Sequence, residues 1–353
     1  MIGKETQTLA KPSNEETSFL FGHKEQIALL LNCINNSQIP NAWLFHGPVG
    51  IGKASLALNV AKLLSNLGNS KKSLSFFSEK DIRNPNASIN VGNIFFLKRK
   101  WDDKKKLFQK NISIDDIREL SRKFSLSSTD NSYKVCIVDT TEDLNLSASN
   151  SLLKMLEEPP KNTLFILVSN NKQSILPTIL SRCQKICFQR LNEDDLRDIS
   201  ASLFHENQFE QLKKAGALNS CEGSVRKLLN FLDKDYIKFF NSMKDLLSDI
   251  PNLNKRKVIK LLAGHKEYLA NNDPDKSAFG ILLRLLASLA KKEINLPINS
   301  KLVNEEIYLI AAHLYAQLSL LRHQSMEYNI DTKKVLFLSF NIIELAFAKY
   351  NKQ

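Results

Sequence analysis

Residues 1–190 alternate between short apolar runs and amphipathic stretches. The apolar runs carry few charges, as buried parallel strands do, and they lie at residues 42–46, 93–97, 133–139, 163–169 and 185–188. Between them, apolar residues recur at helical spacing, for example over residues 56–64, 114–120 and 147–156. Strands that alternate with helices in this way predict an α/β domain built on a doubly wound parallel sheet.

Strand signals stop beyond residue 190, and the rest of the chain shows helical periodicity only. A small helical domain is predicted over residues 191–234, with helices near 193–204, 208–215 and 223–231. A helical bundle is predicted over residues 235–353, with amphipathic segments near 236–248, 255–270, 277–292, 303–323 and 331–349. We therefore expect three domains, at residues 1–190, 191–234 and 235–353.

A glycine-rich loop follows the first predicted strand. Gly47–Ser55 reads Gly-Pro-Val-Gly-Ile-Gly-Lys-Ala-Ser and leads directly into a predicted helix. In the pattern G-x-x-x-x-G-K-[ST], glycines let backbone N–H groups surround phosphate oxygens, and the lysine adds a positive charge. Gly47, Gly50, Gly52 and Lys53 are therefore candidate ligands of a nucleotide, and the strand-loop-helix order supports them.

The position after Lys53 normally carries the hydroxyl that binds Mg²⁺, and here it is Ala54. Ser55 lies one residue further along a segment that is already helical, so its side chain is turned by about 100° around the axis. We keep Ala54 and Ser55 in the candidate site, but we expect neither to replace the missing ligand.

A second acidic position follows the strand at 133–139. Asp139 stands at its carboxyl end, where ligands of open α/β sheets bind, and it is the candidate that acts on Mg²⁺ through water. The next residue would be the glutamate that orients the attacking water, but it is Thr140. Glu142, two residues further on, is a candidate substitute. The sequence thus lacks two separate catalytic groups.

The chain carries a net charge of +12, which would suit contact with nucleic acid. Lys98–Trp101 and Lys104–Lys106 are expected at the tip of a charged hairpin, and Lys255–Lys257 opens a helix. Each is a candidate DNA contact or a solvated face. The chain is also rich in Lys, Asn and Ile throughout, so the charge can equally reflect coding composition.

Five cysteines are scattered along the chain, and we expect reduced thiols and no disulfide framework. Cys183 and Cys187 are four residues apart, but no second pair or nearby histidine completes a zinc site. No apolar segment is long enough to span a membrane, and the first residues contain no apolar signal-peptide core. These features favour a cytoplasmic protein.

Three longer sequence strings indicate which family of nucleotide-binding proteins the chain resembles. Asn150–Pro160 reads Asn-Ser-Leu-Leu-Lys-Met-Leu-Glu-Glu-Pro-Pro, Leu176–Cys183 reads Leu-Pro-Thr-Ile-Leu-Ser-Arg-Cys, and Gly223–Arg226 reads Gly-Ser-Val-Arg. Together with the phosphate loop, these strings resemble the clamp-loader branch of the AAA+ ATPases over nearly the whole chain. The resemblance implies an AAA+ P-loop NTPase domain followed by a helical lid domain and an all-α collar domain.

The resemblance also implies roles for single residues. Arg182, in the Ser-Arg-Cys string, would act in trans as an arginine finger on the γ-phosphate bound by a neighbouring subunit. Arg226 would contact nucleotide bound by this chain, or would be a structural contact. Asn170 or Asn171 would be the first sensor, and the sequence does not choose between them. Many relatives carry a four-cysteine zinc module, but residues 66–130 contain no cysteine, so no zinc is expected.

The expected function is that of a non-motor subunit of the clamp loader that serves the replicative DNA polymerase. Its expected partners are the delta, tau and gamma classes of loader subunits and, through the complex, primed DNA and the sliding clamp. ATP is the expected ligand, bound without hydrolysis, with Mg²⁺ only beside a nucleotide. Two alternatives stay open: an ATP-hydrolysing subunit of the same loader, and a stand-alone DNA-binding protein.

Overall fold

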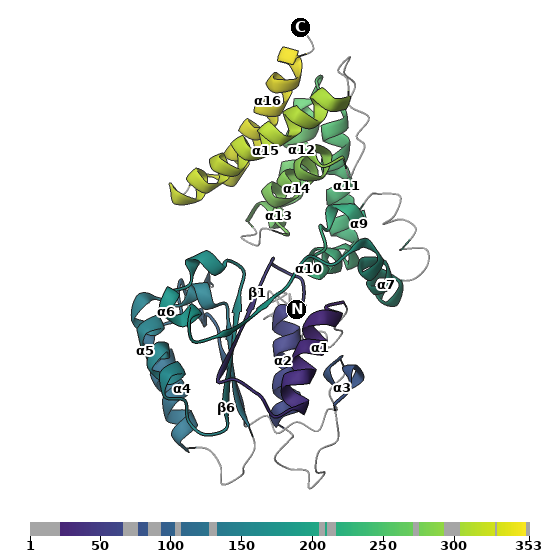
Figure 1. Ribbon diagram of the computed structural model, residues 1–353. Coiled ribbons are helices and arrows are strands. Elements are labelled where there is room, and N and C mark those ends of the chain that lie inside the picture. The colour runs from purple at the N-terminus through teal and green to yellow at the C-terminus, as the bar shows by residue number, and fades with distance from the viewer. Residues whose placement is uncertain are drawn as a thin grey trace, which may run out of the picture. The chain divides into compact units, whose positions relative to one another are not determined.

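The chain forms two compact units, Met1–Arg190 and Leu191–Gln353. The computed structural model describes residues 22–65, 77–83, 93–102, 107–126, 133–204, 209, 217–270, 275–292, 304–328 and 330–350 (Figure 1). None of the helices in this part of the chain is both long and apolar enough to cross a membrane.

A five-stranded parallel sheet runs through the first unit in the order β2-β5-β6-β1-β7. Its strands are β1 (Ala42–His46), β2 (Ile94–Leu97), β5 (Lys134–Asp139), β6 (Thr163–Ser169) and β7 (Gln184–Cys187). The central strand β6 is buried along its whole length, which explains its uninterrupted apolar sequence. The carboxyl ends of β1, β5 and β6 meet at one edge of the sheet, where open α/β sheets bind ligands.

Helices cover both faces of this sheet (Figure 1). One face carries α1 (Lys24–Asn35), α2 (Lys53–Ser65) and α3 (Glu79–Arg83). The other face carries α4 (Ile114–Leu126), α5 (Leu146–Glu157) and the single turn α6 (Pro177–Leu180). Residues of β1 alternate between the two cores: Trp43 and Phe45 pack toward α1 and α2, and Leu44 packs toward α5. The predicted doubly wound α/β fold is confirmed.

A small hairpin follows β2. Its strands β3 (Trp101–Asp102) and β4 (Leu107–Phe108) pair antiparallel, as expected for the charged segment. Residues 103–106, with the predicted lysine-rich tip, lie outside the described residues.

Only helices are found in the described residues of the second unit. They are α7 (Glu193–Leu203), α9 (Ala217–Ser220), α10 (Val225–Leu229), α11 (Lys234–Ser248), α12 (Lys255–Gly264), α13 (Lys266–Ala270), α14 (Ala278–Ala290), α15 (Asn304–Glu327) and α16 (Thr332–Tyr350). Tyr236, Phe239 and Phe240 of α11 are almost fully buried and form the aromatic part of the core.

Two predicted helices differ from those observed. The segment 255–270 is two helices, because His265 leaves helical dihedrals (φ −126°, ψ 55°) and its ring Nδ1 donates to the Leu261 carbonyl at 3.1 Å. The segment 223–231 begins later, at Val225 after its N-cap Ser224, and its end continues as a 3₁₀ turn. Apart from Phe209, the predicted helix at 208–215 lies outside the described residues. The division at 234/235 into lid and collar stays a prediction.

Candidate nucleotide site and arginine finger

The glycine loop begins where β1 ends and gives way to α2 at Lys53. Gly50 and Gly52 have φ values of 76° and 102°, a region that residues with a Cβ rarely adopt. Gly47 meets a different constraint, because a Cβ built there would lie 2.2 Å from the carbonyl oxygen of Phe188. Phe188 follows β7 and donates its own N–H to His46, so the loop and the end of β7 are held against each other. The glycines therefore serve the geometry of the loop itself.

Lys53 is the cation at the centre of this loop. The residue is 4% exposed, and its Nζ donates to the carbonyl oxygen of Gly47 at 2.8 Å, to the carbonyl oxygen of Pro48, and to Asn170 Oδ1 at 3.0 Å. Burial lowers the pKa of Lys53 to about 8, although the nearby carboxylates Glu142 and Asp139 favour the charged form. A phosphate anion at this position would supply negative charge that stabilises the protonated lysine, which the protein oxygens do only in part.

The first turn of α2 contains Ala54 and Ser55, as the sequence predicts. Because α2 starts at Lys53, both follow it inside the helix and point in different directions around the axis. Ala54 presents only a methyl group where the motif calls for a hydroxyl. The structure thus supplies the backbone, the helix N-terminus and the lysine for binding phosphate, without the usual side-chain ligand for Mg²⁺.

Asp139 ends β5, and it lies opposite Val168 of β6 in the sheet. It is close enough to Lys53 to influence its pKa, so the structure brings together the two candidates from separate strands. Thr140 is used locally: its Oγ1 donates to Asp143 Oδ2 at 2.8 Å, and Asp143 forms an ion pair with Arg99 at 2.9 Å. Thr140 has no carboxylate, so it cannot act as the general base that activates water.

Glu142 anchors the end of β6. Its Oε1 accepts hydrogen bonds from Ser169 Oγ at 3.0 Å, from the N–H of Asn171 at 2.6 Å, and from the N–H of Asn170. Its other oxygen, Oε2, is buried and has no hydrogen-bond partner in the described part of the chain. The charge of Glu142 is therefore committed to three donors at one strand end, a structural role that its place in the sequence did not reveal.

The structure separates the two candidates for the first sensor. Asn170 points its Oδ1 at Lys53, whereas Asn171 Oδ1 accepts from the N–H of Gln173 and caps the short turn Lys172–Ser174. Asn170 is the residue at the phosphate loop. Asn171 instead makes a hydrogen bond to the backbone two residues further along the chain.

Arg182 follows α6 and lies at the surface, with 37% of its side chain exposed. Its Nη2 forms an ion pair with Glu157 Oε1 at 2.6 Å, and its Nη1 donates to the carbonyl oxygen of Thr178 at 2.9 Å and to Ser181 Oγ at 3.3 Å. Glu157 is the last residue of α5, so the two longest family strings of this unit meet here. Glu157 is the residue at this site that sequence reasoning missed as a partner, although it stood inside a string already singled out.

Arg226 belongs to the second unit, where it is exposed on α10. The Oγ of Ser224 accepts from the N–H of Lys227 and caps this helix. The role of Arg226 as a phosphate sensor stays a prediction.

Several described residues of the basic segments singled out in the sequence pair with carboxylates, whereas Lys104–Lys106 lie outside the described residues. Lys100 Nζ lies 2.7 Å from Asp116 and 3.3 Å from Glu119, and these contacts raise the pKa of the lysine. The pKa of Asp116 is lowered by Lys100 and Ser113 in spite of burial, and that of Glu119 is lowered first by Lys123 and then by Lys100. In α12, Lys257 lies 2.8 Å from Asp249. These lysines are partly neutralised by their own chain, which weakens the expectation that they contact DNA.

Within the described ranges, no group of three or more His, Cys, Asp or Glu side chains could hold a metal ion. Cys183 is buried, and burial raises the pKa of its thiol to about 11. A thiol in this state is a packing residue and a poor metal ligand.

The match to a family model lies almost entirely in the first unit. Residues 22–192 match the family model described as "DNA polymerase III, delta subunit". The chain is 32% identical over 176 residues to DNA polymerase III subunit delta' of Bacillus subtilis, covering 48% of this chain and 48% of that protein. It is 27% identical over 227 residues to subunit tau of the same organism, covering 60% of this chain and 36% of that protein. The chain thus spans about half the length of these relatives or less.

One solved structure is similar over most of the chain. A DNA polymerase III gamma subunit-related protein from Thermotoga maritima superposes with a TM-score of 0.50 and 18% identity, covering 91% of this chain and 99% of that one. At this identity the likeness concerns the fold alone. With the parallel sheet and its glycine loop, the matches show that residues 22–192 are similar to clamp-loader subunits of DNA polymerase III.

Proposed function

We propose that this chain is a delta-prime-type subunit of the DNA polymerase III clamp loader. Its Arg182 reaches the γ-phosphate of a nucleotide bound by a neighbouring subunit, while its own loop binds nucleotide without hydrolysing it. In this role it works with delta and tau or gamma subunits to load the sliding clamp onto primed DNA. The family match and the identity to a delta' subunit support the proposal that it acts within a clamp-loader complex.

The contrast between its two phosphate-directed cations carries the proposal. Lys53 is buried in the loop, and Ala54 and Thr140 offer neither the hydroxyl for Mg²⁺ nor a carboxylate base. Arg182 is at the surface, where a planar guanidinium can exchange one carboxylate for two phosphate oxygens. The chain is thus better equipped to assist a neighbour's site than to run its own.

Removing the guanidinium tests the finger. In the loader reconstituted from all its subunits, Arg182→Ala is expected to leave assembly intact and to lower DNA-stimulated ATP hydrolysis, by up to about 10³-fold at the site that it serves. Arg197→Ala is the matched control, because Arg197 is an exposed helical arginine with its own acidic partner. Hydrolysis that is unchanged by Arg182→Ala would contradict the assignment.

A second candidate is an ATP-hydrolysing subunit of tau or gamma type, and the match to subunit tau over 60% of this chain favours it. This candidate requires steady-state ATP turnover by the isolated chain that Lys53→Ala abolishes. It also requires a base, and Glu142→Gln would then lower turnover by about 10²-fold or more. We expect no turnover in the unmodified chain, together with measurable binding of labelled ATP.

A further inference from the structure

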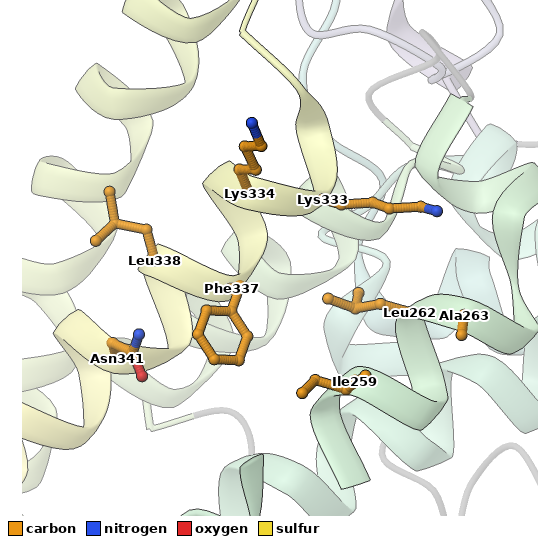
Figure 2. A pocket seen from close by; sticks show the side chains of 8 residues that line it. All are labelled: Ile259, Leu262, Ala263, Lys333, Lys334, Phe337, Leu338 and Asn341. Carbon is orange, nitrogen blue, oxygen red and sulfur yellow. The ribbon is translucent and has the colours of Figure 1, made fainter. Parts of the chain in front are cut away.

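A hydrophobic groove of about 440 Å³ lies between α12 and α16 in the second unit. Its lining residues are Ile259, Leu262, Ala263, Lys333, Lys334, Phe337, Leu338 and Asn341. Figure 2 shows Phe337 between the two helices, the two lysines at the end nearest the start of α16, and Asn341 toward the other end.

The groove exposes apolar side chains on both of its walls. Ile259, Leu262 and Ala263 share one face of α12, and Phe337, Leu338 and Asn341 share one face of α16. Ile259 is 57% exposed and Leu338 is 48% exposed. Single exposed apolar residues are ordinary, but here both line one groove, where an apolar partner would remove them from water.

The groove also contains an unsatisfied acceptor. Asn341 Oδ1 is buried and accepts no hydrogen bond from the described residues. A buried polar atom without a partner is unfavourable, because the loss of its hydrogen bonds to water is not offset. An incoming N–H or O–H group at this point would remove that cost, so the groove favours a ligand with a donor between its apolar groups.

Positive charge gathers at one end of the groove. Lys333 and Lys334 are exposed in the first turn of α16, and no acidic residue lies in that turn. Lysines there oppose the helix dipole, so they do not stabilise the helix that carries them. Asp331 offsets part of the charge by accepting from the N–H of Lys333 at 2.8 Å. No carboxylate is among the eight lining residues, so an anionic partner would complement the charge of the two lysine ammonium groups.

We propose that this groove binds a short acidic peptide segment of another protein. The peptide places two or three bulky apolar side chains between α12 and α16, donates a hydrogen bond to Asn341 Oδ1, and sets its carboxylates beside Lys333 and Lys334. The volume of the groove lies within the range of sites that enclose groups of this size. This inference does not depend on the role of Arg182 or on nucleotide binding at Lys53.

A display selection with random short peptides on the full-length chain tests the proposal, with counter-selection on Ile259→Glu. Enriched peptides are expected to combine Asp or Glu with Leu, Phe or Trp. A synthetic, fluorescently labelled copy of the most enriched peptide is then titrated by anisotropy. The double variant Lys333→Glu/Lys334→Glu is expected to weaken its binding at least about tenfold, since two attractive contacts become repulsive.

The controls distinguish a variant that fails to fold from one that has lost binding. Glutamate in the first turn of a helix is favourable, so the double variant is expected to unfold at an unchanged or higher temperature. Lys234→Glu/Lys238→Glu, on exposed α11 positions, makes the same change of charge and is expected to leave binding unchanged. Enrichment of basic peptides, absence of binders that depend on Ile259, or groove-dependent self-association of the chain in sedimentation would each overturn the proposal.

Discussion

Lys53 and Arg182 are the two cations to which we assign phosphate contacts in the proposed function, but the protein surrounds them in opposite ways. Lys53 is 4% exposed and held by three oxygens, two from its own loop and one from the end of β6. Arg182 is 37% exposed and held by one carboxylate and by oxygens of its own turn. The lysine can serve only a ligand that enters the loop, whereas the arginine can turn to a ligand outside the chain by giving up one surface ion pair.

The difference reflects how each site is built. The environment of Lys53 requires segments more than a hundred residues apart in sequence, because Asn170 reaches it from β6 and Glu142 fixes the position of Asn170. The environment of Arg182 is assembled from the end of α5 and the turn at α6, which lie on one face of the sheet. A change at the loop would therefore leave the arginine site intact.

The largest effect is expected from the loop backbone. Gly47→Ala should lower the free energy of unfolding by about 1–3 kcal/mol, because the added Cβ would meet the carbonyl oxygen of Phe188 at 2.2 Å and the backbone must shift. Urea unfolding measures the change. Gly264→Ala is the control, since its Cβ would meet nothing within 4 Å at the end of α12, and it should be neutral or stabilising. Equal losses in both variants would show that Gly47 is not constrained by this contact.

An intermediate effect is expected from the charge of Lys53. Its pKa of about 8 in the protein without ligand means that more than half of the population is neutral above pH 8. A bound phosphate favours the protonated lysine and raises its pKa, so binding above pH 8 must take up a proton. ATP affinity should be constant below pH 8 and fall up to about tenfold per pH unit above it.

Calorimetric titrations of ATP between neutral and alkaline pH check this dependence. Lys53→Arg provides the comparison, because a guanidinium stays protonated over this range and its binding should not vary with pH. A flat profile in the unmodified chain would show that Lys53 does not contact the bound phosphates.

The smallest effect is expected at the surface ion pair. Glu157→Gln removes the charge beside Arg182 but keeps a hydrogen-bond acceptor, so it should change the free energy of unfolding by less than about 1 kcal/mol. In the reconstituted loader we expect a few-fold decrease in DNA-stimulated ATP hydrolysis, because the guanidinium is less well oriented. Glu193→Gln, beside the exposed Arg197, is the matched substitution and should leave hydrolysis unchanged. A decrease as large as that of Arg182→Ala would assign Glu157 a more direct role.

Much of the first unit could be predicted because its signals are local. Each buried strand is a short apolar run, and the glycine loop is fixed by residues within a few positions of one another. The same reasoning was less successful in the second unit, where the expected helix at 255–270 breaks at His265. Helical periodicity continues through a break of this kind, because α12 and α13 bury similar residues against the same core.

The sequence by itself determined the strands, the glycine loop, the absence of a hydroxyl at Ala54 and of a carboxylate at Thr140, and the strings around Glu157 and Arg182. The tertiary structure decided that Asn170 and not Asn171 faces Lys53, that Glu142 anchors β6, and that α12 and α16 leave a groove between them. The physical reason is the range of the interactions. Periodicity and motifs report contacts within one turn or one strand, whereas these three features depend on which distant segments the fold brings together.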